Sequence, residues 1–536
     1  MGLHCSLFIM KKSKEKDWFK LKRYPHIGLP LNPGDRHKWI EKYVTNPYTV
    51  ASHSFLPFIH KTYRVRKFRR EYMPENGTLN EAYKKENKVL RKVGDKKREL
   101  FYSSQLDSLI YNYYAKLLGE HYETKIKDKE FNLNEVVSAY RSIPIVYGID
   151  GGSNKCNIDF ANDVFKYILN YKETEFVVIT FDITSFFDNL NHKLLGQAWV
   201  EVLGETKLPK DHLNVFRNIT RFSYVDIVDI FEEFKNKIYT RKINKFGKPL
   251  PIKQKRVGKI GFLRNQNAVA FCTKDEFLKI KGKLLQPSKT KKMKNGSIVY
   301  RDFGIPQGSP ISSVLANIYL LHFDKTLNDF ITNNGGIYRR YSDDIVFVCP
   351  LKLKDDLISI VQREIASFKL EIQSSKTQIF HFKREREKLV CGQEFQSVIN
   401  WNKHLIYLGF EFDGDSVLLK SASLSGYYRK MKKYVRRAKH YANKLHSKSR
   451  GEIFKARIFK KFSYKGAKRI RKRVWLKAEN RFQNTDSYNW GNFLTYAFKA
   501  SKRMVNNKIK SQTSRHWNIL NDLIKSQSYS KGLNRP

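Results

Sequence analysis

The sequence of 536 residues is 41% hydrophobic and 14% aromatic, so it can bury a large core and is expected to form several subdomains. Its 102 lysines and arginines exceed its 51 aspartates and glutamates by far more than solubility requires, and the formal charge of +51 predicts a polyanionic partner, most simply nucleic acid. Five scattered cysteines without a Cys-x-x-Cys pair, and the lack of an apolar run of membrane-spanning length, argue against a disulfide framework, a zinc site and a membrane protein, and indicate a cytoplasmic chain.

Two helices are predicted in the N-terminal part of the chain. Residues 1–100 are polar and basic, apart from an apolar and aromatic patch at 54–70. The stretch LDSLIYNYYAKLLGEHY (106–122) then has apolar residues at helical spacing, namely Leu106, Ile110, Tyr113, Tyr114, Leu117 and Leu118. A second helix is predicted over 158–170.

The middle of the chain begins with a strand. EFVVITFDI (175–183) is apolar and β-branched, which predicts a buried strand that carries Asp182 at its tip. A helix is predicted over 192–203. The lysine-rich residues 241–297 are predicted to be loop-like and to belong to a basic insertion at about 204–297.

A Gly/Pro turn opens a long predicted helix over 304–331, GIPQGSPISSVLANIYLLHFDKTLNDFI. The stretch YRRYSDDIVF (338–347) follows and places Asp343 beside Asp344. Alone, this doublet is typical of a tight turn between two strands, because Ser and Asp are ordinary turn residues. IVFVC is then predicted as a strand, and 353–369 as a helix.

Past IYLGFEFDG (406–414) the apolar spacing becomes helical. The stripe consists of Leu424, Met431, Val435, Ala438, Ala442 and Leu445. Basic residues cover the other faces, namely Arg429, Lys430, Lys432, Lys433, Arg436, Arg437 and Lys439. Residues 420–536 contain 32 lysines and arginines against 4 acidic residues. A helical segment that packs on one side and follows a phosphate backbone on the other is therefore predicted.

Asp182 and the Asp343–Asp344 doublet would form a cluster of three carboxylates if their strands are neighbours. Clustered carboxylates repel one another unless a cation holds them. Mg²⁺ fits this need, because it prefers carboxylates together with phosphate oxygens. Two such ions can activate a 3′-hydroxyl and stabilise a leaving pyrophosphate.

Five stretches, in this order, resemble the motifs of reverse transcriptases. FDITSFFDNLNHKLL, GIPQGSPISSVLANIYL and RRYSDDIVFV resemble the A, B and C motifs. LEIQSSKTQIF (370–380) resembles the motif that follows, and IYLGFEF the primer-gripping hairpin. The resemblance covers about 176–415 and implies an α+β right-hand polymerase with fingers, palm and thumb.

The resemblance also implies roles for single residues. Asp182, Asp343 and Asp344 would be catalytic and would bind two Mg²⁺ ions, with Mn²⁺ as an alternative. The Ile183 carbonyl would be an extra metal ligand. Phe187 would exclude a ribose 2′-hydroxyl, although ordinary core packing also explains it.

Further residues would contact substrate. Gln307 would lie against the incoming dNTP, and Gly308 would let the backbone come close. Tyr341 would lie near the primer end, and Lys376 near the triphosphate. For Arg141 a role in the fingers and a structural salt bridge are equally supported.

The outer stretches resemble bacterial anti-phage reverse transcriptases of the abortive-infection and "unknown group" lineage. These stretches are SSQLDSLIYNYYAKLL, AYRSI with NKCNIDFANDVFKYI, and WGNFLTYAFKASKRM. The domains are then 1–175 (N-terminal extension and fingers), 176–403 (palm) and 404–536 (thumb and a helical, basic C-terminal region). The expected template is RNA, for which a dedicated non-coding RNA is one candidate, and the expected product is DNA.

Two alternatives remain open. The first is a template-independent or protein-primed DNA polymerase of the same lineage. The second is a catalytically inactive nucleic-acid-binding scaffold, against which the three acids argue. The sequence leaves open whether the chain forms a homo-oligomer, and it identifies neither the primer nor the phage trigger.

Overall fold

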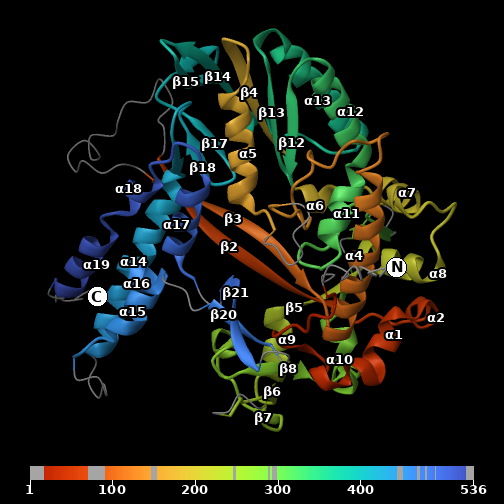
Figure 1. Ribbon diagram of the computed structural model, residues 1–536. Helices are drawn as coiled ribbons and strands as arrows, with labels where there is room; N and C mark the ends of the chain where they lie inside the picture. Colours follow the sequence, from red (N-terminus) through yellow and green to blue (C-terminus); the bar gives the residue numbers. More distant parts are fainter. Residues whose placement is uncertain are drawn as a thin grey trace, which may run out of the picture.

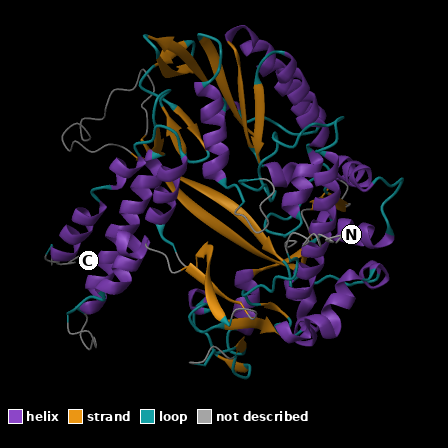
Figure 2. Cartoon of the chain, in the orientation of Figure 1, coloured by secondary structure: helices purple, strands orange, loops and turns teal. Residues whose placement is uncertain are grey.

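The structure, a computed structural model, describes residues 17–70, 91–146, 154–244, 249–287, 290–292, 298–443, 451–467, 471–476, 480–488 and 491–526. Helices and sheets are mixed, as Figures 1 and 2 show, in agreement with the predicted α+β class. No helix in the described part of the chain is both long and apolar enough to cross a membrane. The described cysteines are all free, namely Cys156, Cys272, Cys349 and Cys391.

A six-stranded antiparallel sheet lies at the centre of the fold. In spatial order its strands are β12 (Ile337–Tyr341), β13 (Asp344–Pro350), β4 (Glu175–Asp182), β14 (Gln378–Glu385), β15 (Lys388–Phe395) and β16 (Val398–Asn400). The predicted strands over 175–183 and at IVFVC are confirmed as β4 and β13. Strand β4 is an interior strand, with β13 on one side and β14 on the other.

Both faces of strand β4 are buried. Val177, Ile179 and Phe181 pack into one core, whereas Phe176 and Val178 pack into the other. The first core includes residues of α4 (Gln105–Lys125), α7 (His192–Leu203), α11 (Ser312–Tyr319), α12 (Leu321–Asn333) and α13 (Lys354–Ser367). The second includes residues of α5 (Asn157–Leu169), β17 (Leu405–Tyr407), β18 (Phe410–Phe412), β19 (Val417–Leu419) and α17 (Phe493–Arg503). A strand buried on both faces reads as a continuous apolar run.

Four predicted helices are confirmed, and a fifth is divided. The helices predicted over 106–122, 158–170, 192–203 and 353–369 are α4, α5, α7 and α13. The helix predicted within 304–331 is broken at the buried Leu320, whose φ and ψ are −96° and 12°. Both α11 and α12 bury residues in the same core.

The N-terminal patch at 54–70 forms a long hairpin. Strand β2 (Phe58–Arg70) pairs along its length with β3 (Arg91–Tyr102), and β5 (Ser223–Asp226) and β9 (Gln286–Pro287) complete that sheet. Figure 1 shows this hairpin crossing the middle of the molecule. Short helices precede it, namely α1 (Glu41–Thr45) and α2 (Pro47–Ala51), and α2 packs against α8 (Lys210–Thr220).

Part of the region predicted as loop-like is folded. It contains β7 (Lys253–Lys255), β8 (Ala268–Cys272) and α10 (Lys274–Leu284). Strand β8 pairs in parallel with β1 (His26–Ile27) and antiparallel with β6 (Ile238–Thr240). The prediction was wrong for these elements because β8 finds one of its partners near the start of the chain, where local sequence patterns give no indication of it.

The C-terminal region is helical with one exception. Its helices, which gather on one side in Figure 1, are α14 (Ser421–Ala442), α15 (Lys455–Phe462), α16 (Tyr464–Ala467), α17, α18 (Ile509–Thr513) and α19 (His516–Lys525). Met431, Val435 and Ala442 of the predicted apolar stripe are buried, whereas Leu445 lies outside the described residues. The exception is the antiparallel hairpin of β20 (Arg471–Leu476) and β21 (Arg481–Tyr488), for which no strands were predicted.

We expect His26 to make the fold sensitive to acid. The ring is buried, Nδ1 accepts a hydrogen bond from the Ile27 N–H (2.7 Å), and Nε2 lies 3.0 Å from the Tyr102 carbonyl, to which it donates. Burial lowers the pKa of His26 to about 4. Because the unfolded chain takes up this proton first, stability falls as the pH drops from about 6.5 towards 4.

Denaturant titrations at pH 7.5 and 5.0 test this expectation. The free energy of unfolding should fall by about 2 kcal/mol more in the wild type than in His26→Gln, which cannot titrate. An equal loss in both proteins would contradict the assignment.

Candidate active site

Strand pairing brings the separated acids together. In the β4–β13 register, Asp182 is the cross-strand partner of Asp344, and residues opposite each other in this way lie about 4.5–5.5 Å apart at Cα. Asp343 lies in the turn before β13, and its carbonyl accepts a hydrogen bond from the Ile183 N–H (3.3 Å). Ser342 has a φ of 63°, in the left-handed region that tight turns use. Acids that are far apart in the sequence thus lie at the same end of two neighbouring strands of the central sheet.

The negative charges at this end of the two strands are only partly balanced by nearby lysines. Burial of the carboxyl group and the neighbouring charges of Asp343 and Asp182 raise the pKa of Asp344 to about 6, against the opposing effect of Lys420 and Lys376. Asp344 is nevertheless exposed at the surface, so solvent screens much of this repulsion. Lys376 Nζ lies 2.8 Å from Asp182 Oδ1. An added positive charge would therefore be stabilised here. Lys420 was not among the predicted site residues, although it follows the IYLGFEF motif closely in the chain.

The chemistry of these donors fits a hard divalent cation, because carboxylates that repel one another bind such ions well. Among the residues that the structure describes, however, no group of three histidine, cysteine, aspartate or glutamate side chains is arranged to hold a metal ion. The Lys376 ammonium instead contacts one Asp182 oxygen. The metal roles of Asp182, Ile183, Asp343 and Asp344 therefore stay predictions.

A buried ion pair lies behind the turn and was missed by the sequence analysis. The Arg340 guanidinium donates to both carboxylate oxygens of Asp324, at 2.7 and 2.5 Å, and both side chains are fully buried. Arg340 also donates to the Ser342 carbonyl and to Asn317 Oδ1, each at 3.2 Å. Tyr338 donates to Asp324 at 2.7 Å. This network fixes the backbone directly before the two acids. The alternation along β12, with Tyr338 and Arg340 on one face, was the signal that could have revealed it.

Removal of one partner of this pair should be costly. We expect Asp324→Asn to lower the free energy of unfolding by about 3–5 kcal/mol, because it leaves a buried guanidinium without a counter-charge. The double variant Arg340→Met with Asp324→Leu should recover most of that loss in denaturant titrations, yet it should still incorporate nucleotides more slowly, since the bond to the Ser342 carbonyl is gone. Full stability in Asp324→Asn would contradict this account.

Two aromatic rings follow Asp182, and they differ in burial. Phe186 is buried in the first core, whereas Phe187 is only partly buried and packs on that core from its edge. The ring centroids are 5.5 Å apart. The carbonyl of Phe187 accepts a hydrogen bond from the Ile305 N–H (2.9 Å), which ties this turn to the Gly/Pro turn before α11. The partly buried ring is the one that a ligand could reach.

The Gly/Pro turn also contacts the hairpin of β2 and β3. The carbonyl of Gln307 accepts a hydrogen bond from the Phe101 N–H (2.9 Å). Gly308 has a φ of +117°, and a Cβ at this position would lie 2.7 Å from the Phe101 carbonyl oxygen. The glycine is therefore required by this contact within the fold. The Gln307 side chain is partly exposed.

Two tyrosines lie beside the turn of Ser342 and Asp343. The Tyr341 ring is partly buried and lies 6.0 Å from that of Phe160. The Tyr140 hydroxyl lies 2.9 Å from Ser342 Oγ, and 47% of this residue is exposed. The sequence analysis missed Tyr140, although it directly precedes Arg141 in AYRSI.

The structure favours the second of the two roles considered for Arg141, the structural salt bridge. Its guanidinium makes a bidentate ion pair with Glu123, at 2.6 and 2.8 Å. The remaining donors bond the carbonyls of Asn134 and Val137 and the Asn134 side chain. Since these bonds occupy all five N–H groups and the side chain is only 3% exposed, Arg141 has a structural role and has no donor left for a nucleotide.

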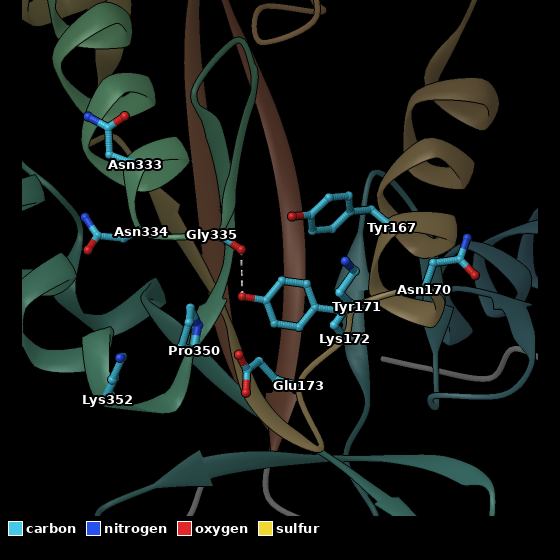
Figure 3. A pocket seen from close by; sticks show the side chains of 10 residues that line it. All are labelled: Tyr167, Asn170, Tyr171, Lys172, Glu173, Asn333, Asn334, Gly335, Pro350 and Lys352. Carbon is cyan, nitrogen blue, oxygen red and sulfur yellow. Dashed lines mark hydrogen bonds between the residues drawn. The ribbon is translucent and has the colours of Figure 1, made fainter.

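A cavity of about 680 Å³ lies elsewhere on the central sheet, as Figure 3 shows. Its lining includes Tyr171, whose hydroxyl donates to the Gly335 carbonyl (2.9 Å), and Pro350. Pro350 ends β13, and Glu173 of the lining precedes β4, so the cavity lies at the opposite end of these strands from the acids. It is not part of the candidate site.

One family comparison bears on this site. Residues 220–412 match the family model described as reverse transcriptase (RNA-dependent DNA polymerase). The chain therefore carries a reverse transcriptase domain, the nucleotidyltransferase domain of RNA-directed DNA polymerases. The match includes the SDD turn and the Gly/Pro turn but begins after Asp182. No curated protein matches the chain.

Solved telomerase structures from Candida show limited similarity. Apo telomerase from Candida tropicalis, truncated from the C-terminal domain, is 12% identical with a TM-score of 0.33, over 61% of this chain and 52% of that chain. Telomerase from Candida tropicalis in complex with a TWJ fragment of telomeric RNA is 14% identical with a TM-score of 0.31, over 66% and 48%. The corresponding complex from Candida albicans is 13% identical with a TM-score of 0.31, over 75% and 54%. The chain thus spans about half the length of these solved chains.

Proposed function

We propose that the chain is an RNA-directed DNA polymerase of the right-hand type, with fingers and N-terminal extension in 1–175, palm in 176–403 and thumb with a basic C-terminal region in 404–536. One observation carries the proposal. The register of β4 and β13 places Asp182 opposite Asp344, next to a turn that lies within the reverse transcriptase match. Extension of a DNA primer on an RNA template tests it.

In the proposed mechanism the acids act together. Asp182, Asp343, Asp344 and the Ile183 carbonyl would hold Mg²⁺ or Mn²⁺, which supplies charge stabilisation for in-line transfer of the nucleotide to a 3′-hydroxyl. Lys376, which is 2.8 Å from Asp182, would contact the triphosphate of the dNTP. The Arg340–Asp324 pair would hold the turn in position while the substrates change.

The exposed basic face of α14 would follow the phosphates of the template and product. Arg429, Lys433 and Arg436 recur at helical spacing and are exposed, whereas the stripe of Met431 and Val435 is buried. Lys439 differs from the prediction, because its ammonium donates to the Ser526 carbonyl and is partly buried.

Neutralising Arg429, Lys433 and Arg436 to Gln should weaken nucleic-acid binding and flatten its salt dependence. Each lost phosphate contact lowers the slope of log affinity against log salt by about 0.7–0.9, so the triple variant should lose about 2–3. Filter binding over a salt series measures this slope. Lys439→Gln is the control and should change the slope little. If the triple variant keeps the wild-type slope, this face is merely solvated.

We further propose that the enzyme acts in the bacterial cytoplasm in defence against phage. Two of the outer stretches that support this assignment meet in the fold. Arg503 of α17 pairs with Asp159 of α5 at 2.8 Å, and Asn157 donates to the Tyr496 hydroxyl at 2.8 Å. Plaque counts on bacteria that produce the wild type or Asp343→Asn test the role. Protection should need the intact acid, and equal plaque counts would contradict it.

A further inference from the structure

A groove between α14 and α15 combines aromatic rings with arginines. It has a volume of about 530 Å³, and its lining includes Tyr434, Arg437, Tyr441, Phe454 and Arg457. Figure 1 shows both helices in the C-terminal region, away from the central sheet. The groove is therefore separate from the candidate active site, and the mechanism proposed above does not use it.

The rings in this groove are unusually exposed for such large apolar groups. Phe454 is 68% exposed and Tyr441 is 55% exposed. Tyr434 is partly buried, since it packs on Phe462 with ring centroids 5.5 Å apart, and it forms the inner wall. Exposed aromatic surface beside a packed wall is typical of a binding site rather than of a folding core.

The basic side chains around the rings favour a polyanionic ligand. The Arg457 guanidinium lies 5.4 Å from the centroid of the Phe454 ring, and the Lys461 ammonium lies 4.3 Å from that of Tyr434. Arg437 is exposed on the same wall, and Glu452 is the one acid in the described lining. The basic face of α14 continues from this wall towards Arg429.

We propose that this groove binds unpaired nucleotides, whose bases stack on Phe454 and Tyr441 while Arg437 and Arg457 contact the flanking phosphates. Stacking on aromatic side chains beside basic residues is how proteins hold single strands. A duplex cannot use the rings, because its bases are already stacked on one another. The groove thus gives the C-terminal region a site for a single-stranded segment, in addition to the phosphate contacts of α14. The inference rests on the proposed function only in taking nucleic acid as the partner.

Fluorescence anisotropy with the full-length protein tests the groove without catalysis. The probes are labelled single strands of about 12 nucleotides, one of oligo-U RNA and one of oligo-dT DNA, and a duplex of the same length. We expect Phe454→Ala to bind the single strands about 5- to 100-fold more weakly and the duplex within about twofold of the wild type. The salt dependence should not change, because stacking releases no counterions. Phe454→Trp should restore single-strand affinity.

A matched control separates the groove from general aromatic exposure. Phe395, on β15, is 70% exposed, and Phe395→Ala should leave all affinities unchanged. A loss of affinity for RNA, for DNA or for both in Phe454→Ala supports the proposal and shows which kind of single strand the groove binds. Unchanged single-strand affinity in Phe454→Ala would overturn the proposal and would favour a protein partner for the groove. An equal loss of affinity for the duplex would overturn the proposal as well. Because no catalysis is measured, either failure leaves the polymerase proposal untouched.

Discussion

Replacing Asp343 by asparagine should abolish DNA synthesis and leave the protein folded. Asp343 lies in the turn beside Asp344 and bonds the end of β4 through its carbonyl, which the substitution retains. The lost charge is one that the proposed cation needs, so we expect incorporation of labelled dNTPs to fall by at least about 10³-fold. Asp182→Asn and Asp344→Asn should behave in the same way.

The stability of these variants separates catalysis from folding. Loss of one charge relieves the repulsion that raises the pKa of Asp344, so the melting temperature should stay the same or rise. Asp355→Asn, an exposed acid at the start of α13, is the matched control and should incorporate normally. Incorporation at the wild-type rate by Asp343→Asn with Mg²⁺ present would refute the assignment of the site.

Phe187 should decide between deoxyribonucleotides and ribonucleotides. Its ring is partly buried and follows Asp182 by one tight turn, and the α6 helix (Phe186–Asn189) begins after Ser185, which has a φ of 45°. If the ring lies against C2′ of the bound nucleotide, a ribose hydroxyl must clash or shift the α-phosphate. A shift of about 1 Å can cost on the order of 10²-fold in rate. Phe187→Ala or Phe187→Val should therefore raise ribonucleotide use far more than it lowers deoxyribonucleotide use.

The ratio of dNTP to rNTP incorporation efficiency measures this choice. Phe186 is the rival residue, but its side chain is buried in the core, so Phe186→Leu should lower stability and leave the ratio nearly unchanged. Active Phe187 variants with the wild-type ratio would place the sugar selection elsewhere.

The elements that could be predicted are those whose local pattern and packing agree. Strand β4 and helix α7 lie where their sequences predict, because β4 is an apolar run buried on both faces and Asn191 caps α7 at its N-terminus. The contact of Asp182 with the SDD turn required one assumption, that the two strands are neighbours, and the sheet order supplies it.

The features that could not be predicted from the sequence depend on partners that are distant along the chain. Strand β8 pairs with β1 and was taken for a loop, while Arg340 finds its counter-charge on α12. Arg141 shows the converse, because its motif position left substrate contact and a structural salt bridge equally supported, and the fold uses all five of its donors internally. Local patterns indicate burial, but they do not indicate which residue meets which.

Primer extension on RNA tests the central claim most directly. The purified protein is given a labelled DNA primer annealed to RNA templates of defined sequence, with Mg²⁺ and each dNTP in turn. We expect DNA whose sequence is complementary to each template, and none with Asp343→Asn. Product whose sequence ignores the template, or DNA that stays covalently bound to the protein when no primer is present, would contradict the claim. The second outcome would favour the protein-primed alternative, for which the Tyr140 hydroxyl, 2.9 Å from Ser342 Oγ, is one candidate primer.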